Sequence, residues 1–388
     1  MSDSRFPVIP IAIVVGIVLA GVFYSLLTTF EAADSEYTVV DLGALEEGTR
    51  TRVYGFNSHD GLTGEIQTRE GKTRAFVWDP QEGLTILGTL GGNASYGRAI
   101  NDSGQAVGFS DLEGSGARAY LWTREEGMRD LGVLGGARSE ANSNTWDGRV
   151  LGISTINPTG EAHAFLWSVE EGMRDLGTLG GKRSEVFAAN ASGTLVGWSL
   201  PADRMAGRAA VWTTTGAIQD LGTLGGEAAT AYGIDSKGRV VGKAEKSKNV
   251  YRAFLWSATV GMVDLGTLGG TWSVAYSLSE KGEVFGLSSI GGSGGAGWMG
   301  EVGRWLTGDS GVGGDSHAVV WREGKPFDLN GSIPPDSGWE LIEAFAINTQ
   351  GNILARGICN GEARSCYLIP RGAVNPFSGH IARFHDES

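Results

Sequence analysis

The chain has 388 residues, of which 31 are Lys or Arg and 44 are Asp or Glu, so its net charge is −13. Nucleic-acid phosphates are bound by clustered basic residues, and this chain has no basic run, so we exclude nucleic acid as a partner. The 63 glycines predict a fold with many turns.

The first predicted element is a membrane-spanning helix at residues 6–30. This stretch has no charged residue, and 25 residues of helix span about 37 Å, enough to cross a hydrocarbon core of about 30 Å. The apolar region of a cleaved signal peptide has only about 7–15 residues, so we expect an uncleaved signal anchor, with cleavage as the alternative.

The charges around this helix predict its orientation. Arg5 precedes it and Glu31 follows it, so the positive-inside rule places residues 1–5 in the cytoplasm and the rest in the periplasm or outside the cell. The linker 31–36 reaches about 20 Å at most. We therefore expect a single-pass membrane protein whose large domain lies close to the membrane surface.

Residues 37–370 consist of one repeated unit, which is clearest at 162–181, AHAFLWSVEEGMRDLGTLGG. The Trp that ends its AFLW motif marks six copies and a Tyr marks the seventh: Trp78, Trp122, Trp167, Trp212, Trp256, Trp321 and Tyr367. Except for one interval of 65 residues, the copies are 44–46 residues apart. A period of about 40–50 residues is typical of a propeller blade, so we predict an all-β, seven-bladed β-propeller.

Four short segments in each repeat have the composition of strands. In AFLW, Phe165 and Trp167 point to one face while Ala164 and Leu166 point to the other, so the strand needs an apolar layer on both sides. Stacked blades supply such layers, and we expect the Trp residues to be core. We place the AIN-type segment innermost in each blade, followed by VVG, AFLW and DLG.

This order predicts how the ring closes. The repeat region opens with a segment of the outermost type and ends with one of the third type. We therefore expect residues 37–42 to pair with residues 365–369, so that the N-terminal strand completes the last blade. Such closure removes the open sheet edges that promote aggregation.

The long interval belongs to an insertion in the sixth blade, at residues 289–316. It is rich in glycine and carries Trp298, Met299, Trp305 and Leu306. A tolerated surface loop and a docking loop remain equal alternatives, because exposed Trp residues are costly unless a partner covers them.

The remaining partner-binding candidates belong to the connections between blades. The GGxxS connections and the variable loops between second and third strands should emerge on one face, and the tight turns on the other. Binding usually resides in long, unlike loops. We therefore expect a protein partner to dock on the first face, at Arg138, Lys182, Arg183 and Trp272 together with the insertion.

The two cysteines, Cys359 and Cys366, flank a turn in the seventh repeat. We expect a disulfide between them, because an extracytoplasmic location favours oxidation, although two free thiols remain the alternative. Residues 371–388 form a polar tail, which we expect to be partly disordered or to lie on a partner.

The sequence contains no convincing nucleophile–base set, phosphate loop or metal-ligand cluster, so we predict neither cofactor nor metal. His163 and His317 occupy a repeat position that holds Arg in other copies, which indicates a structural hydrogen-bonding role. The repeated Asp of DLG is expected to anchor a turn. Enzymatic activity is uncertain and less expected than binding, since propellers can build sites from distant residues.

These motifs resemble the HAF repeat family, bacterial proteins expected to be extracellular. The name-giving His-Ala-Phe is His163-Ala164-Phe165, and the pattern covers residues 37–370. The resemblance implies export and a repeated β-fold but no enzymatic activity.

Together, the sequence predicts an extracytoplasmic, membrane-anchored propeller that acts as a protein-binding scaffold or accessory subunit of a complex in the same membrane. A glycan-binding or glycan-cleaving propeller, with sugar rings or another small-molecule ligand on Trp272, Trp298 and Trp305, is one alternative. A purely structural cell-surface protein is the other.

Overall fold

The computed structural model describes residues 35–46, 49–291 and 316–378. Within these ranges the protein has 28 strands and one short 3-10 helix, η1 (Leu329–Ser332). No helix in these ranges is long and apolar enough to cross a membrane. The predicted span at residues 6–30 lies outside the described residues, as does nearly all of the insertion.

The strands form antiparallel units of four. Five units are separate sheets, and two more share one eight-stranded sheet through a parallel pairing of Ala162 with Arg183. The bounds, unit by unit, are β2 (Arg50–Phe56), β3 (Leu62–Gln67), β4 (Thr73–Asp79) and β5 (Gly83–Ile86); β6 (Gly91–Ile100), β7 (Ala106–Leu112), β8 (Ala117–Thr123) and β9 (Gly127–Asp130); β10 (Ser139–Asn144), β11 (Val150–Thr155), β12 (Ala162–Ser168) and β13 (Gly172–Asp175); β14 (Gly180–Ala189), β15 (Leu195–Pro201), β16 (Arg208–Trp212) and β17 (Ile218–Asp220); β18 (Ala229–Ile234), β19 (Val240–Ser247), β20 (Val250–Ser257) and β21 (Gly261–Asp264); β22 (Gly269–Leu278), β23 (Val284–Ile290), β24 (Ser316–Arg322) and β25 (Lys325–Asp328); and β26 (Trp339–Ile347), β27 (Ile353–Cys359), β28 (Glu362–Pro370) and β1 (Tyr37–Asp41).

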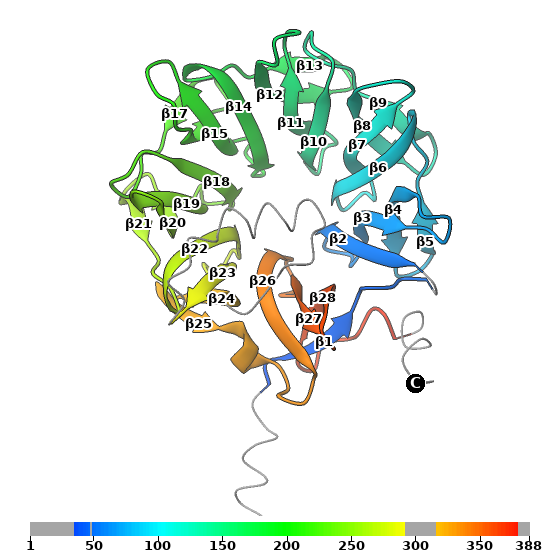
Figure 1. Ribbon diagram of the computed structural model, residues 1–388, viewed down its shortest axis with the longest axis vertical. Helices are drawn as coiled ribbons and strands as arrows, with labels where there is room; N and C mark the ends of the chain where they lie inside the picture. Colours follow the sequence, from blue (N-terminus) through cyan, green and yellow to red (C-terminus); the bar gives the residue numbers. More distant parts are fainter. Residues whose placement is uncertain (1–34, 47–48, 292–315, 379–388) are drawn as a thin grey trace, which may run out of the picture.

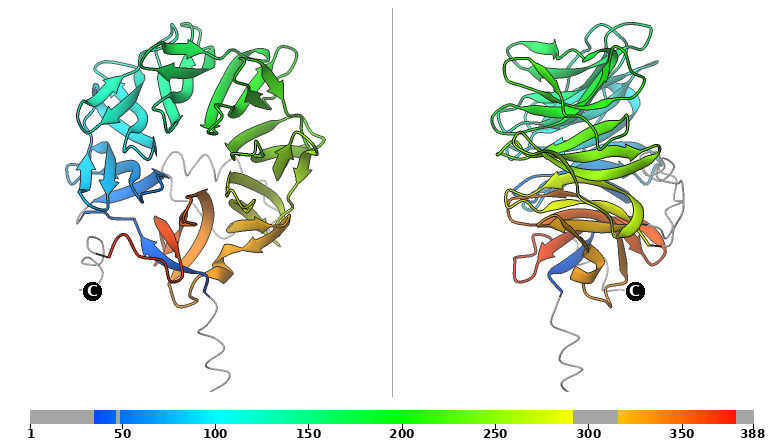
Figure 2. Two further views of the ribbon diagram at one scale, coloured as in Figure 1. Left: turned by 180° about the vertical axis from the view of Figure 1, so that it is seen from behind. Right: turned by 90° about the vertical axis from the view of Figure 1, so that its left-hand side faces the viewer.

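The units are arranged around a common axis, which gives an all-β, propeller-like fold (Figure 1). The first strand of each unit lies nearest the axis and the fourth lies on the perimeter, and Figure 2 shows the same arrangement from behind and from the side. The predicted strand order within a unit is confirmed, because sequence neighbours pair in every unit.

The predicted pairing of the two ends of the repeat region is also confirmed. Strand β1 runs antiparallel to β28, with Tyr37 opposite Pro370 and Asp41 opposite Cys366, and the Leu42 amide donates to the Ser365 carbonyl at 2.9 Å. Apolar side chains of the first and last units then pack in one cluster across this seam. The N-terminal strand therefore supplies the outer edge of the last unit.

The motif tryptophans lie between the units, as predicted. Five are buried, at positions 78, 122, 167, 212 and 321, while Trp256 is half-buried. The serine of the GGxxS motif ties neighbouring units together. Ser139 accepts a hydrogen bond from the Ala119 amide of the preceding unit at 2.9 Å and donates to the Gly132 carbonyl at 2.6 Å. Ser95, Ser184 and Ser273 make the same pair of bonds.

The connections define two faces. The start of β6, at residues 91–93, and the connection from β7 to β8, at residues 113–116, line one small hollow. The connections that enter first strands and those between second and third strands therefore meet on one side, which we call the loop face. The tight turns between first and second strands, and between third and fourth strands, form the opposite turn face. Gly104 closes one such turn with φ at +74°, as predicted.

The start of the C-terminal tail packs on the propeller itself. Phe377 is 1% exposed and lies against Trp78 at 4.7 Å and Tyr367 at 5.2 Å between ring centroids. The tail was expected to be partly disordered or to lie on a partner, whereas Phe377 fills the seam between the first and last units of the propeller itself. Residues 379–388 lie outside the described range.

Candidate functional site

The three predicted basic residues lie on the loop-face side of the inner strands. Arg138 pairs with Glu140 at 2.7 Å, and Lys182 pairs with Glu161 at 2.9 Å. Arg183 is exposed in β14. Two of the three cations thus already have carboxylate partners within the chain.

The predicted exposure of Trp272 is wrong. Strand β22 begins at Gly269, so Trp272 is a strand residue and not a loop residue. It is 6% exposed and packs with Val274 and Leu287. The other aromatic and apolar candidates, Trp298, Met299, Trp305 and Leu306, lie outside the described residues.

The predicted disulfide does not form in the structure. Both thiols are free and buried. Cys359 stands opposite Glu362 and Cys366 opposite Ala355, so the cysteines are four register positions apart. This is roughly 13 Å at about 3.3 Å per residue, whereas disulfides need Cα atoms about 4.4–6.8 Å apart. Burial raises the pKa of both thiols, which keeps them protonated and unreactive.

The repeated His and Asp residues have the structural roles predicted for them. His163 bonds to Asp175 at 2.9 Å, and Asp175 also accepts a hydrogen bond from the Gly177 amide at 2.7 Å. His317 makes the equivalent bond to Asp328 at 2.6 Å, which raises the pKa of His317. Within the described ranges, no group of three or more His, Cys, Asp or Glu side chains could hold a metal ion.

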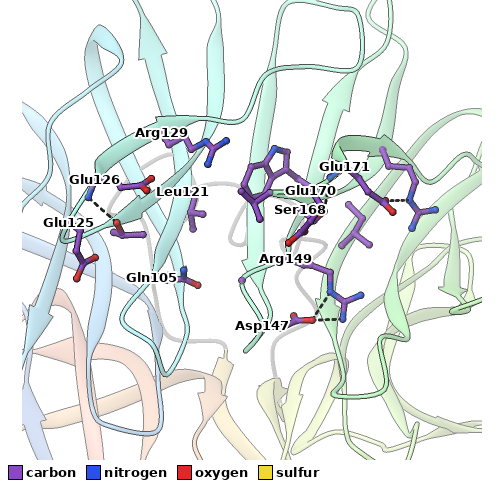
Figure 3. A pocket seen from close by; sticks show the side chains of 16 residues that line it. Gln105, Leu121, Glu125, Glu126, Arg129, Asp147, Arg149, Ser168, Glu170 and Glu171 are labelled. Carbon is purple, nitrogen blue, oxygen red and sulfur yellow. Dashed lines mark hydrogen bonds and ion pairs between the residues drawn. The ribbon is translucent and has the colours of Figure 1, made fainter.

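An open groove of about 1090 Å³ lies on the turn face, between the second and third units. Figure 3 shows its lining from close by. Its floor contains Leu121, Leu166 and Trp167, and its rim is formed by the turns at 123–126, 147–149 and 168–171. We call it the turn-face groove.

Acidic side chains dominate the rim of the turn-face groove. Asp147 is paired with Arg149 at 3.0 Å, but Glu125, Glu126 and Glu170 have no ion-pair partner in the part of the chain that the structure describes. The Arg129 guanidinium lies over the Trp167 ring at 5.3 Å. The groove thus combines an apolar floor with an excess of negative charge.

Sequence reasoning missed this groove because it assigned binding to the long loops. A signal was present, since the turns TREEG and SVEEG place a Glu pair at the same repeat position in two successive units.

The turn face also carries exposed apolar side chains. Trp146 is 70% exposed, and Val169, Val260 and Val374 are exposed as well. On the loop face the only comparably exposed large hydrophobic residue among those described is Met205, at 99%. The turn face is therefore the more apolar of the two described faces.

The chain also joins the propeller on the turn face. Strand β28 is the third strand of its unit, and in the other units the third strand ends in a turn on the turn face. Tyr37, the first residue of β1, pairs with Pro370 at this end of β28. Glu36, which precedes Tyr37, therefore lies on the turn face. Its carboxylate pairs with Arg322 at 2.6 Å, and its carbonyl accepts from the Arg371 amide at 2.8 Å. Arg322 is also paired with Glu283, at 3.0 Å. Residue 36 is thus held in place on this face.

No protein-family model and no curated protein matches the chain. Solved structures do match. The β-propeller domain of the Trilobed protease from Pyrococcus furiosus, described as having an open velcro topology, is 7% identical with a TM-score of 0.52, over 83% of this chain and 96% of that one. Puromycin hydrolase is 12% identical with a TM-score of 0.51, over 86% and 56%.

TolB from Acinetobacter baumannii is 13% identical with a TM-score of 0.40, over 55% of this chain and 53% of that one. The chain therefore spans only about half the length of the TolB and puromycin hydrolase chains. At such low identity, the similarity to the Pyrococcus furiosus domain and puromycin hydrolase shows the fold alone. That fold is a β-propeller.

Proposed function

We propose that this protein is a membrane-anchored, extracytoplasmic, seven-bladed β-propeller of the HAF repeat type that holds a protein partner in the same membrane. Its N-terminal strand closes the ring. The observation that carries the proposal is the position of Glu36, which fixes the chain on the same face as the turn-face groove.

The proposed anchor brings this face to the membrane. Because Glu36 is bound to Arg322, only residues 31–35 separate the apolar segment 6–30 from the propeller. Five residues reach about 18 Å at most. The turn face, with Trp146 and Val260 exposed on it, then lies within reach of the headgroups or of a partner's membrane-proximal surface, where exposed apolar side chains become covered.

The turn-face groove indicates what the partner presents. Glu125, Glu126 and Glu170 lie around an apolar floor, so a segment with Lys or Arg residues and one or two apolar side chains complements it. Complementary charges speed association and exclude acidic competitors. The partner is therefore a membrane protein with a basic stretch next to its membrane span.

Charge reversal in the groove tests this proposal. The variant Glu125→Lys/Glu170→Lys, expressed as the full chain in its native membrane, should lose its partner on native gels of mild-detergent extracts. Glu113→Lys is the matched control, because Glu113 is an exposed carboxylate on the loop face. Retained complex in the groove variant, or an intact protein that always migrates alone, would contradict the proposal.

The loop face is the competing docking surface. Arg183 and the insertion support it, whereas the paired Arg138 and Lys182 and the buried Trp272 make it weaker. Deleting residues 292–315, which spares the paired ends of β23 and β24, distinguishes the two. Partner capture should survive the deletion if the turn-face groove is the docking site, and should be lost if the loop face is.

A further inference from the structure

The first strand of every unit contains a β-bulge at the same place. In each first strand the register shifts by one residue, which leaves one residue without a partner on the second strand. We call these residues the axial belt: Tyr54, Arg98, Asn142, Phe187, Tyr232, Tyr276 and Phe345. Each stands three residues before the residue that opens the following turn.

In six of the seven units a glycine in the second strand pairs with the residue just before the bulge, and in the last unit Ala355 occupies this position. A Cβ atom at Gly108 would lie 1.9 Å from the Tyr96 carbonyl oxygen, and one at Gly197 would lie 1.9 Å from the Glu185 carbonyl oxygen. At these two positions only glycine allows such a close backbone approach. Bulges re-aim a side chain out of the strand's alternation, and these strands are the ones nearest the axis (Figure 1).

Three pairs of belt side chains meet across unit boundaries. The rings of Phe187 and Tyr232 are 5.4 Å apart, as are those of Tyr232 and Tyr276, and the Arg98 guanidinium lies 5.1 Å from the Tyr54 ring. All seven side chains are half-buried. The belt is therefore a partly exposed and largely aromatic surface around the axis, and residues from different units build it.

Two guanidinium groups stack on these rings. Arg98 lies between Tyr54 and Phe109, 5.1 and 5.3 Å from their centroids, and has no carboxylate partner among the described residues. The Arg356 guanidinium lies 5.0 Å from the centroid of the same Tyr54 ring and pairs with Glu343 at 3.2 Å. A guanidinium stacked on a ring keeps its N–H edge available for a carboxylate.

From this geometry we propose that the axial belt binds an acidic saccharide. The C–H faces of its sugar rings would lie on the rings of Phe187, Tyr232 and Tyr276, and a uronate carboxylate would accept hydrogen bonds from Arg98. The Asn142 amide nitrogen already donates to Glu185 and to the Val186 carbonyl, so Asn142 offers its side-chain oxygen as an acceptor, and the hydroxyls of Tyr54 and Tyr232 supply further hydrogen-bonding groups.

A saccharide fits this surface better than a purely apolar ligand does. The belt combines five half-buried rings with the polar side chains of Arg98 and Asn142, so it is not purely apolar. A pyranose ring has the same two-sided character, with C–H groups on its faces and hydroxyl groups at its edge. The buried Trp272 packs behind Tyr232 and Tyr276 and holds them in place. Trp272 thus supports the belt from behind and does not itself contact ligand.

The test is calorimetric titration of the full chain in detergent with tetragalacturonate, its neutral methyl ester, and tetraglutamate. Tetragalacturonate should bind, and Arg98→Gln should weaken its binding about 10- to 100-fold, as expected for loss of a charged hydrogen bond. Arg98→Lys should restore part of the affinity. Tyr232→Ala should weaken the binding of both tetragalacturonate and its methyl ester. Arg129→Gln, which removes a guanidinium stacked on Trp167 outside the belt, is the matched control.

Three results would overturn the proposal: no binding of tetragalacturonate, equal binding of tetraglutamate, or equal losses in the Arg98 and Arg129 variants. Near-ultraviolet circular dichroism of each variant checks that the fold is retained. The proposal is independent of the turn-face groove, since Glu125→Lys/Glu170→Lys should leave saccharide binding unchanged.

Discussion

Removing the Phe377 side chain tests whether the C-terminal tail stabilises the seam of the ring. The side chain is almost fully buried, stacks on Trp78 of the first unit and meets Tyr367 of the last unit edge-on. Truncating a buried Phe to Ala usually costs about 3–5 kcal/mol. Because Phe377 lies close to the end of the described chain and the site can partly collapse, we expect about 3 kcal/mol for Phe377→Ala.

The assay is guanidinium chloride unfolding of the full chain in mild detergent, followed by tryptophan fluorescence. The unfolding midpoint of Phe377→Ala should fall with little change in slope. Val374→Ala is the control, because Val374 is 87% exposed in the same tail and should change stability by less than about 0.5 kcal/mol. Equal midpoints for the two variants would refute a stabilising tail.

Three further predictions concern the described core. The bond to Asp328 raises the pKa of His317 in the folded protein. Protonated His317 therefore stabilises the fold fully below about pH 6.5, and this stabilisation is lost as the pH rises through the raised pKa. His317→Gln should therefore flatten the dependence of the unfolding midpoint on pH in that range, and an unchanged dependence would contradict the assignment. Titration without reductant should find two thiols, Cys359 and Cys366, in denatured protein and almost none in folded protein, whereas a disulfide would leave none in either. Ser139→Ala should cost about 1–3 kcal/mol in chemical unfolding, because it leaves a buried amide unpaired; a neutral effect would show that the serine does not tie the units together.

Much of the fold follows from the period of the sequence. The AFLW strand is apolar on both faces, as Phe165 and Ala164 show, so it has to lie between two layers. The order of the segments shows that the last unit lacks its outer strand and that the first segment of the repeat region is of the outer type. The pairing of β1 with β28 was therefore predictable. Both features depend on local composition and chain order alone.

Other features depend on register and tertiary packing, which composition does not specify. The disulfide prediction failed because closeness to a turn does not make Cys359 and Cys366 opposite each other. Trp272 was assigned to a loop because glycines precede it, yet the strand starts at those glycines. Phe377 is a single apolar residue in a polar tail, and only the folded seam shows what it contacts.

The axial belt had a sequence signal that was not recognised. Positions such as Tyr232 and Tyr276 lie at one fixed distance before the turn in every repeat. Their variety, from Arg98 to Asn142, hides the pattern, since a structural repeat position usually keeps one residue type. Only the register shift shows that they share a backbone conformation.

The orientation of the propeller at the membrane is the most direct test of the account. A fluorophore is attached through a single introduced cysteine either at Val260 on the turn face or at Met205 on the loop face of the full chain in nanodiscs. Quenching by headgroup-labelled lipids is then compared between the two sites. The account predicts strong quenching at position 260 and little at position 205. Equal quenching, or stronger quenching at position 205, would contradict it.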